Sequence, residues 1–241
     1  MATKGRSRIG TSGWQYDHWK GIFYPAGLAK DRWFAFYSEH FDTVEVNNTF
    51  YHLPSAAAFD AWREEAPEGF CYALKFSRYG TQMKKLKDPD TTIGNFMERA
   101  QRLRSFLGPI LVQLPPRWKP DVPRLRAFLD AAPSNVRWAV EFRDAAWLVE
   151  DVFSVLRDHN AALVIHDKIK DHPREVTADW VYLRFHGVDY THNYSQEQLT
   201  DAARWIRERL DSGLDAYAYF NNDAYAYAVA NAEELRTLVE K

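Results

Sequence analysis

The run WVYLRFHG, residues 180–187, alternates apolar and polar side chains and ends on charged and polar groups. Successive side chains of a β-strand point to opposite faces, so Arg184 and His186 would share one face and Leu183 the other. If the apolar face packs against helices, the polar face must point toward an interior. We therefore predict a buried strand whose inner face is polar.

Seven further runs of this kind occur along the 241 residues, and most of them also stop on charged or amide side chains. They span 9–14, 43–50, 71–76, 110–115, 137–143, 161–167 and 215–223. Stretches with helical spacing lie between them, at 30–39, 56–65, 92–106, 122–132, 150–159, 195–212 and 224–240. A strand–helix unit repeated eight times indicates an α/β fold, a single (β/α)8 TIM-type barrel over residues 1–241.

One unit of this pattern is degenerate, because residues 168–179 lack helical spacing between the sixth and seventh strands. Ser55, Ser195 and Asp223 are the expected caps of the helices that follow them. A doubly wound open sheet is the alternative fold. It is less favoured because no Gly-x-Gly-x-x-Gly turn follows the first strand.

The bulk composition excludes some classes of protein. A formal charge of −2 and a pI near 6.5 give no support to a globally basic nucleic-acid binder. No run reaches transmembrane length, and the first eight residues contain no apolar signal core. The single cysteine, Cys71, forms no intrachain disulfide, which favours a reducing compartment. We expect a cytoplasmic protein with no membrane partner, and its oligomeric state stays open.

The carboxyl ends of the strands form the active-site face of such a barrel. Glu45 and Glu141 end two strands there and are our candidate general acid and base. His186 is a third catalytic candidate and Lys75 a fourth. A barrel lysine can form a Schiff base if its surroundings deprotonate it, whereas nearby carboxylates would keep Lys75 charged.

Other strand-end and loop residues are candidates for ligand binding. Arginines would hold negative charge, amides would orient hydroxyl groups, and aromatic rings would wall the pocket. The candidates are Trp14, Asn47, Tyr51, Gln113, Arg143, Trp147, Arg184, Asn221 and Asp223. The same polar lumen could instead be a structural network of ion pairs, which would make the protein a non-catalytic binding barrel.

A divalent metal is a less favoured cofactor hypothesis. His166, Asp167 and His186 could join Glu45 or Glu141 as ligands, as in metal-dependent isomerases or nuclease-like hydrolases. The sequence contains no His-Glu-x-x-His and no Cys-x-x-Cys pattern, and its histidines are scattered.

Two loops carry alternative interpretations. Residues 78–87 are basic, with Arg78, Lys84, Lys85 and Lys87, and could receive phosphate or a nucleic-acid backbone, although a solvated surface is the commoner case. Residues 13–19 contain two tryptophans and a tyrosine, which suit either a stacking platform or a hydrophobic plug.

Several motifs, in this order, resemble the YecE-like family, also called domain of unknown function 72. They are GTSGW (10–14), FYP (23–25), VEVNNTFY (44–51), QLPP (113–116), EFR (141–143) with Trp147, YLRFHG (182–187), YFNND (219–223) and Asn231-Ala232. The resemblance covers essentially the whole chain and implies a TIM-type barrel, but it implies no reaction. Many relatives carry a Thr-His pair where this chain has Thr81-Gln82, which argues against catalysis by that loop.

We therefore predict acid/base chemistry on a small polar ligand, sugar-like or phosphorylated, at the C-terminal face of the barrel. In this hypothesis Glu141 or Glu45 transfers the proton, and Arg143, Arg184 and Lys75 hold negative charge.

Overall fold

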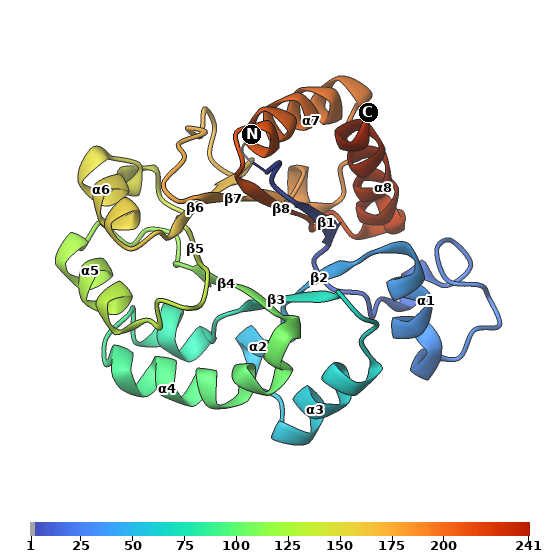
Figure 1. The fold of residues 1–241 in the computed structure, drawn as a ribbon, viewed down its shortest axis with the longest axis horizontal. Coiled ribbons are helices and arrows are strands. Elements are labelled where there is room, and N and C mark those ends of the chain that lie inside the picture. Colours follow the sequence, from blue (N-terminus) through green and yellow to red (C-terminus); the bar gives the residue numbers. More distant parts are fainter. Residues whose placement is uncertain (1–2) are drawn as a thin grey trace.

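A computed structural model describes residues 3–241 as a ring of parallel strands with helices around the outside (Figure 1). Met1 and Ala2, the start of the amino-terminal stretch in which we saw no signal core, lie outside the described residues. The strands are β1 Ser7–Thr11, β2 Thr43–Val46, β3 Cys71–Lys75, β4 Leu107–Gln113, β5 Trp138–Glu141, β6 Ala162–His166, β7 Trp180–Phe185 and β8 Asp215–Phe220.

The α-helices lie between the strands. They are α1 Trp33–His40, α2 Asn48–Tyr51, α3 Ala56–Glu65, α4 Pro89–Ala100, α5 Val122–Ala131, α6 Glu150–Asp158, α7 Gln196–Asp211 and α8 Tyr227–Glu240. Shorter helical turns are η1 Asp17–Trp19, η2 Lys30–Arg32, η3 Tyr79–Met83, η4 Gln101–Phe106, η5 Ala145–Trp147, η6 Val188–Tyr190 and η7 Ala224–Ala226.

The strand order confirms the predicted eight-stranded barrel. Neighbours pair in parallel from β2 through β8, and β8 pairs with β1. The ring is nearly closed, because a single bridge, Ser12 to Glu45, links β1 to β2 in the described chain. The buried Tyr37 hydroxyl fills this seam: it accepts from the Thr11 N–H at 3.1 Å and donates to the Thr43 carbonyl at 3.0 Å.

The lumen is filled asymmetrically. β7 and β8 contribute four large inward rings, whereas the facing strands contribute small residues such as Ala73, Ala139 and Ala162. Large side chains opposite small ones fill a barrel interior without voids. The charged groups of the lumen lie above this apolar layer, at the carboxyl ends of the strands. Leu183 and Phe142 point the other way, into the core between strands and helices, as the predicted alternation requires.

The structure corrects some predicted element boundaries. β2 ends at Val46, and residues 48–50, predicted as strand, belong to α2. At this turn the Thr49 hydroxyl contacts the carbonyls of Val46 at 3.1 Å and Lys75 at 2.7 Å, which ties the start of α2 to the ends of β2 and β3. Residues 168–179 contain no helix, as predicted.

The helix caps were predicted in part. Ser55 accepts from the Ala58 N–H, and Ser195 forms a capping box with Gln198. The prediction for Asp223 was wrong, because it precedes η7 without a capping hydrogen bond and its carboxylate faces His18 instead. Over residues 3–241, none of the helices combines the length and apolar character that a membrane crossing requires.

Candidate functional site at the carboxyl end of the barrel

Arg184 bridges two buried carboxylates across the top of the lumen. Its Nη2 lies 2.7 Å from Glu45 Oε1 and its Nη1 lies 2.6 Å from Glu141 Oε2. All three side chains are almost inaccessible to solvent. Burial alone would lower the pKa of Arg184, but the two carboxylates outweigh it and raise the pKa, so the guanidinium stays charged. The bridge therefore joins β7 to both β2 and β5.

Two hydroxyl groups complete the shell of Glu45. The Ser12 hydroxyl donates to Oε1 at 2.7 Å, and the Tyr182 hydroxyl donates to Oε2 at 2.6 Å. Burial and the charge of Glu45 raise the pKa of Tyr182, so the phenol keeps its proton and remains a donor. Both oxygens of this carboxylate are thus engaged.

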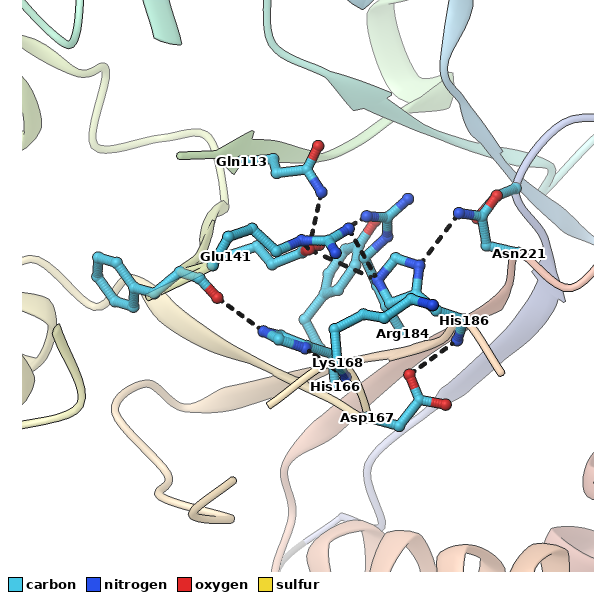
Figure 2. A network of polar contacts seen from close by, with 12 residues as sticks. Gln113, Glu141, His166, Asp167, Lys168, Arg184, His186 and Asn221 are labelled. Carbon is cyan, nitrogen blue, oxygen red and sulfur yellow. Dashed lines mark hydrogen bonds and ion pairs between the residues drawn. The ribbon is translucent and has the colours of Figure 1, made fainter. Parts of the chain in front are cut away.

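Glu141 is surrounded by donors in the same way (Figure 2). Besides Arg184, Gln113 Nε2 donates to Oε1 at 2.8 Å and Arg143 Nε forms a close ion pair with that oxygen. Burial would raise the pKa of Glu141, but Arg184, Arg143 and His186 together hold it well below its usual range. An efficient base needs a pKa near the working pH, so this environment disfavours the acid/base role that we expected for Glu141.

His186 is a buried neutral imidazole. Its Nδ1 lies 3.1 Å from Asn221 Nδ2, and its Nε2 lies 3.5 Å from Glu141 Oε1. Burial and the nearby Arg184 lower the pKa of His186 to about 4. If Asn221 donates to Nδ1, the ring proton sits on Nε2 and faces the carboxylate. In this arrangement His186 orients Glu141.

Lys75, at the end of β3, is the buried cation whose side chain forms no hydrogen bond or ion pair within residues 3–241. The residue is 8% exposed, and its Nζ lies 4.3 Å from the ring centroid of Phe50. Although the Lys75 Nζ has no hydrogen-bond partner among the described residues, it is not fully buried, so solvent reaches it. Burial, followed by the charge of Arg184, lowers the pKa of Lys75 to about 8. The effect of burial thus exceeds that of the carboxylates expected to keep the amine charged.

A cavity of about 350 Å³ opens beside these groups. It is lined by Phe50, Gln82, Gln113, Leu114, Pro116, Arg143, Lys168 and Tyr190. The Phe50 ring packs against the Lys75 ammonium group. Arg143 and Gln113, which also line the cavity, both contact the Glu141 carboxylate. The cavity is therefore a small, polar, cationic hollow above the buried network.

Lys168 and Tyr190 form one wall of this cavity. The Lys168 Nζ donates to the Gly187 carbonyl at 2.8 Å and lies 4.2 Å from the Tyr190 ring centroid. Sequence reasoning missed both residues. Lys168 lies in the segment without helical spacing, and Tyr190 has a left-handed φ of 63° in a loop, so no periodic pattern placed them.

The predicted metal ligands are brought together only in part. Ligand atoms of Glu141, His166 and His186 lie within 4.8 Å of one another. However, His166 Nε2 donates to the Phe142 carbonyl at 2.8 Å, and its Nδ1 accepts from the Lys168 N–H at 3.1 Å. The guanidinium groups around Glu141 also oppose a divalent cation electrostatically.

Asp167, the third predicted ligand, is outside that cluster. It accepts from the backbone N–H groups of His186 at 3.1 Å and Gly187 at 2.9 Å, and also from the Tyr194 hydroxyl. Burial acts to raise the pKa of Asp167, but the hydrogen bonds from the Tyr194 hydroxyl and the Gly187 N–H outweigh it, so the pKa is lowered. Asp167 anchors the loop after β7.

The expected aromatic walls lie elsewhere. Trp14 is buried and packs edge-on against Phe34 and Trp62, and Trp147 stacks on Phe142 with centroids 5.0 Å apart. Both rings belong to the core between strands and helices and are not among the residues that line the cavity described above. Their size favoured burial over exposure at the mouth.

Three other candidates lie at the margins. Tyr51 is 71% exposed and lines a separate hollow with Tyr79. Asn47, which directly follows β2, is half-buried, and its Oδ1 has no partner among the described residues. Asp223 lies on the outer rim, 3.2 Å from His18 Nε2.

The two singled-out loops pack onto the barrel. The basic loop contains η3, where Gln82 Nε2 donates to the Gln113 carbonyl at 3.1 Å and Lys84 pairs with Asp88 at 2.8 Å. Gln82, at the position of the missing histidine, thus forms part of the cavity wall. In the first loop Trp19 is fully buried, which favours the hydrophobic plug.

Comparisons with known proteins agree with this architecture. The model of the family described as "Protein of unknown function DUF72" matches residues 8–241. UPF0759 protein YecE of Escherichia coli (strain K12) is 32% identical over 108 residues, 44% of this chain, and the match spans 40% of that protein. UPF0759 protein YunF of Bacillus subtilis is 25% identical over 96% of this chain and 94% of its own length.

Solved structures share the whole fold. The crystal structure of a DUF72 family protein from Thermotoga maritima aligns with a TM-score of 0.87 at 28% identity, covering 98% of this chain and 100% of that one. A DUF72 family protein from Enterococcus faecalis aligns with a TM-score of 0.81 at 18% identity, covering 98% and 96%, and at this identity it supports the fold alone.

Proposed function

The chain belongs to the DUF72 family, and from the charge balance at its barrel mouth we propose that it is an enzyme that acts on a small anionic molecule by acid/base chemistry. The ligand binds at the C-terminal face, in the cavity above the buried network. A phosphorylated or carboxylated polar compound is the class of ligand that suits this site.

One observation carries the proposal: the network contains more cations than anions. Glu45 and Glu141 contribute two negative charges, while Arg184, Arg143 and Lys75 contribute three positive charges. A surplus positive charge at a partly desolvated mouth attracts an anion. The carboxylates cannot supply that counter-charge, because Arg184 and Arg143 already engage them.

The acid/base function is assigned to Lys75 rather than to a carboxylate. An amine whose pKa lies about one unit above neutrality can both give and accept a proton at working pH. Glu141, by contrast, holds its proton too weakly to transfer it. Arg143 and Gln113 are placed to orient the anionic and hydroxyl groups of a ligand.

Replacing Arg143 by glutamine should weaken anion binding. Thermal-shift titration of the wild-type protein with inorganic phosphate, at ionic strength held constant with sodium chloride, should show saturable stabilisation. Losing one charged hydrogen-bond donor should weaken the apparent phosphate affinity by about 10- to 100-fold. An uncharged sugar should bind less well than a sugar phosphate.

Arg126→Gln is the matched control, because Arg126 pairs with Asp158 on the outer helices and is 45% exposed. Equal phosphate responses of the Arg143 and Arg126 variants would remove Arg143 from the site. A wild-type protein that does not respond to any phosphate or carboxylate compound would remove the proposal itself.

The second candidate function is a non-catalytic binding barrel. It is favoured by the complete pairing of Glu45 and Glu141, which is also what a purely structural network requires. The behaviour of Lys75 separates the two candidates, since a structural network has no use for a destabilised amine. A nucleic-acid role for the basic loop has less support, because Lys84 is neutralised by Asp88.

A further inference from the structure

We propose that Lys75 is a covalent nucleophile that forms an imine with the carbonyl group of a small anionic aldehyde or ketone held in the cavity. The inference rests on the proposed function, since the anionic group must first bind at the mouth. It adds the substrate class, an α-keto acid or a phosphorylated aldehyde or ketone, and the covalent step.

The first support is that the other cations around the cavity are occupied. Arg184 is paired with two carboxylates and Arg143 with one, and Lys168 donates to a backbone carbonyl at 2.8 Å. Within the described residues, Lys75 Nζ has no acceptor of its own. A nitrogen without a hydrogen-bond partner is free to meet an electrophile.

The second support is the way Lys75 is positioned. It ends β3 on the inward face, and its carbonyl accepts the Thr49 hydroxyl at 2.7 Å, which fixes the backbone. The Lys75 Nζ lies 4.3 Å from the centroid of the Phe50 ring, and that ring also lines the cavity, so the amine packs against an apolar group that it shares with the cavity wall. Such desolvation activates a lysine for attack on a carbonyl.

The third support is the fraction of reactive amine. Only the neutral form attacks a carbonyl carbon. With the pKa near 8 that burial and Arg184 produce, roughly one-tenth of Lys75 is neutral at pH 7, against about 0.03% of an ordinary lysine.

The step is balanced without any further reactant. The amine nitrogen adds to the carbonyl carbon, and the resulting carbinolamine loses its hydroxyl group. The oxygen leaves as water with the two hydrogens of the amine, and a C=N double bond remains. The imine nitrogen can then take a proton from solvent. Arg143, at the cavity wall, is placed for the carboxylate or phosphate of the same molecule.

Reductive trapping tests the inference. The intact protein is incubated at pH 7 with sodium cyanoborohydride and either pyruvate or glycolaldehyde phosphate, and peptide mass mapping then locates the adducts. Cyanoborohydride delivers hydride to the imine carbon and leaves a stable secondary amine. We expect one main adduct, on Lys75, formed at least about tenfold faster than on any exposed lysine such as Lys119. Pyruvate and glycolaldehyde phosphate distinguish the carboxylate from the phosphate source of the anion.

Two controls keep the outcome decisive. Lys75→Arg removes the nucleophilic amine, so it should lose the adduct, whereas Lys119→Arg, outside the site, should keep both the adduct and the stabilisation by inorganic phosphate. In the wild-type protein, excess phosphate should protect Lys75 while leaving Lys119 labelling unchanged, and this control needs no variant. Labelling of Lys75 no faster than Lys119, in a protein that phosphate stabilises, would overturn the imine and leave the anion site standing. Absence of any phosphate response would overturn the proposed function instead.

Discussion

Replacing Arg184 by methionine is expected to lower the free energy of unfolding by about 3–5 kcal/mol. The substitution removes the bridge between Glu45 and Glu141 and leaves one buried carboxylate with only hydroxyl donors. An uncompensated buried charge is costly because neither water nor a cation can stabilise it. The size of the side chain is nearly kept, so the loss reports charge rather than packing.

Urea denaturation at pH 7 measures this loss, with Arg204→Met as the matched control. Arg204 pairs with Asp201 on the surface and is 64% exposed, so its substitution should change stability by about 0.5 kcal/mol or less. Adding Glu45→Gln and Glu141→Gln to the Arg184 variant should recover part of the loss, since the three charges act as one unit. An Arg184 variant as stable as the Arg204 variant would contradict the buried network.

Replacing Lys75 by methionine is expected to do the opposite and raise stability at pH 7 by about 1–3 kcal/mol. The pKa of Lys75 is lowered from its ordinary 10.5 to about 8, so folding disfavours its charged form. Burial and the facing charges of Arg184 and Arg143 outweigh Glu141 and Glu45 in setting this pKa.

The pH dependence gives the sign of this effect. Below pH 8 Lys75 is protonated in both states, and its full destabilising effect is present. Between pH 8 and 10.5 the folded state binds fewer protons than the unfolded state, so the wild-type protein gains stability relative to Lys75→Met. Above pH 10.5 the difference levels off.

Chemical denaturation of both proteins from pH 7 to 10.5 measures this difference, with Lys119→Met as the control for an exposed lysine. A Lys75 variant several kcal/mol less stable than the wild type at pH 7 would make Lys75 a structural member of the network. That outcome would favour the non-catalytic binding barrel.

The barrel itself could be predicted from the sequence because strand alternation is local. The pattern around Arg184 and His186 placed both inside, and the structure agrees. The same alternation identified Glu45 and Glu141 as inward-facing. It could not show that Arg184 would engage both carboxylates, because that pairing joins three strands far apart in the sequence.

The residues that line the cavity were harder to predict from the sequence. Trp14 and Trp147 lie near strand ends, but their rings turn into the outer core, since apolar burial outweighs a place at a wet mouth. Tyr190 and Lys168 come from loops whose backbone follows no period. The lowered pKa of Lys75 also depends on a balance of burial and charge that only the packed structure sets.

The measurement that tests the central claim most directly is the pKa of Lys75 in the intact protein. Competitive trace acetylation across pH 6 to 11, read by peptide mass mapping, gives the titration of each lysine. We predict an apparent pKa near 8 for Lys75, raised when inorganic phosphate fills the cavity. A Lys75 pKa near 10.5 that phosphate leaves unchanged would contradict the account.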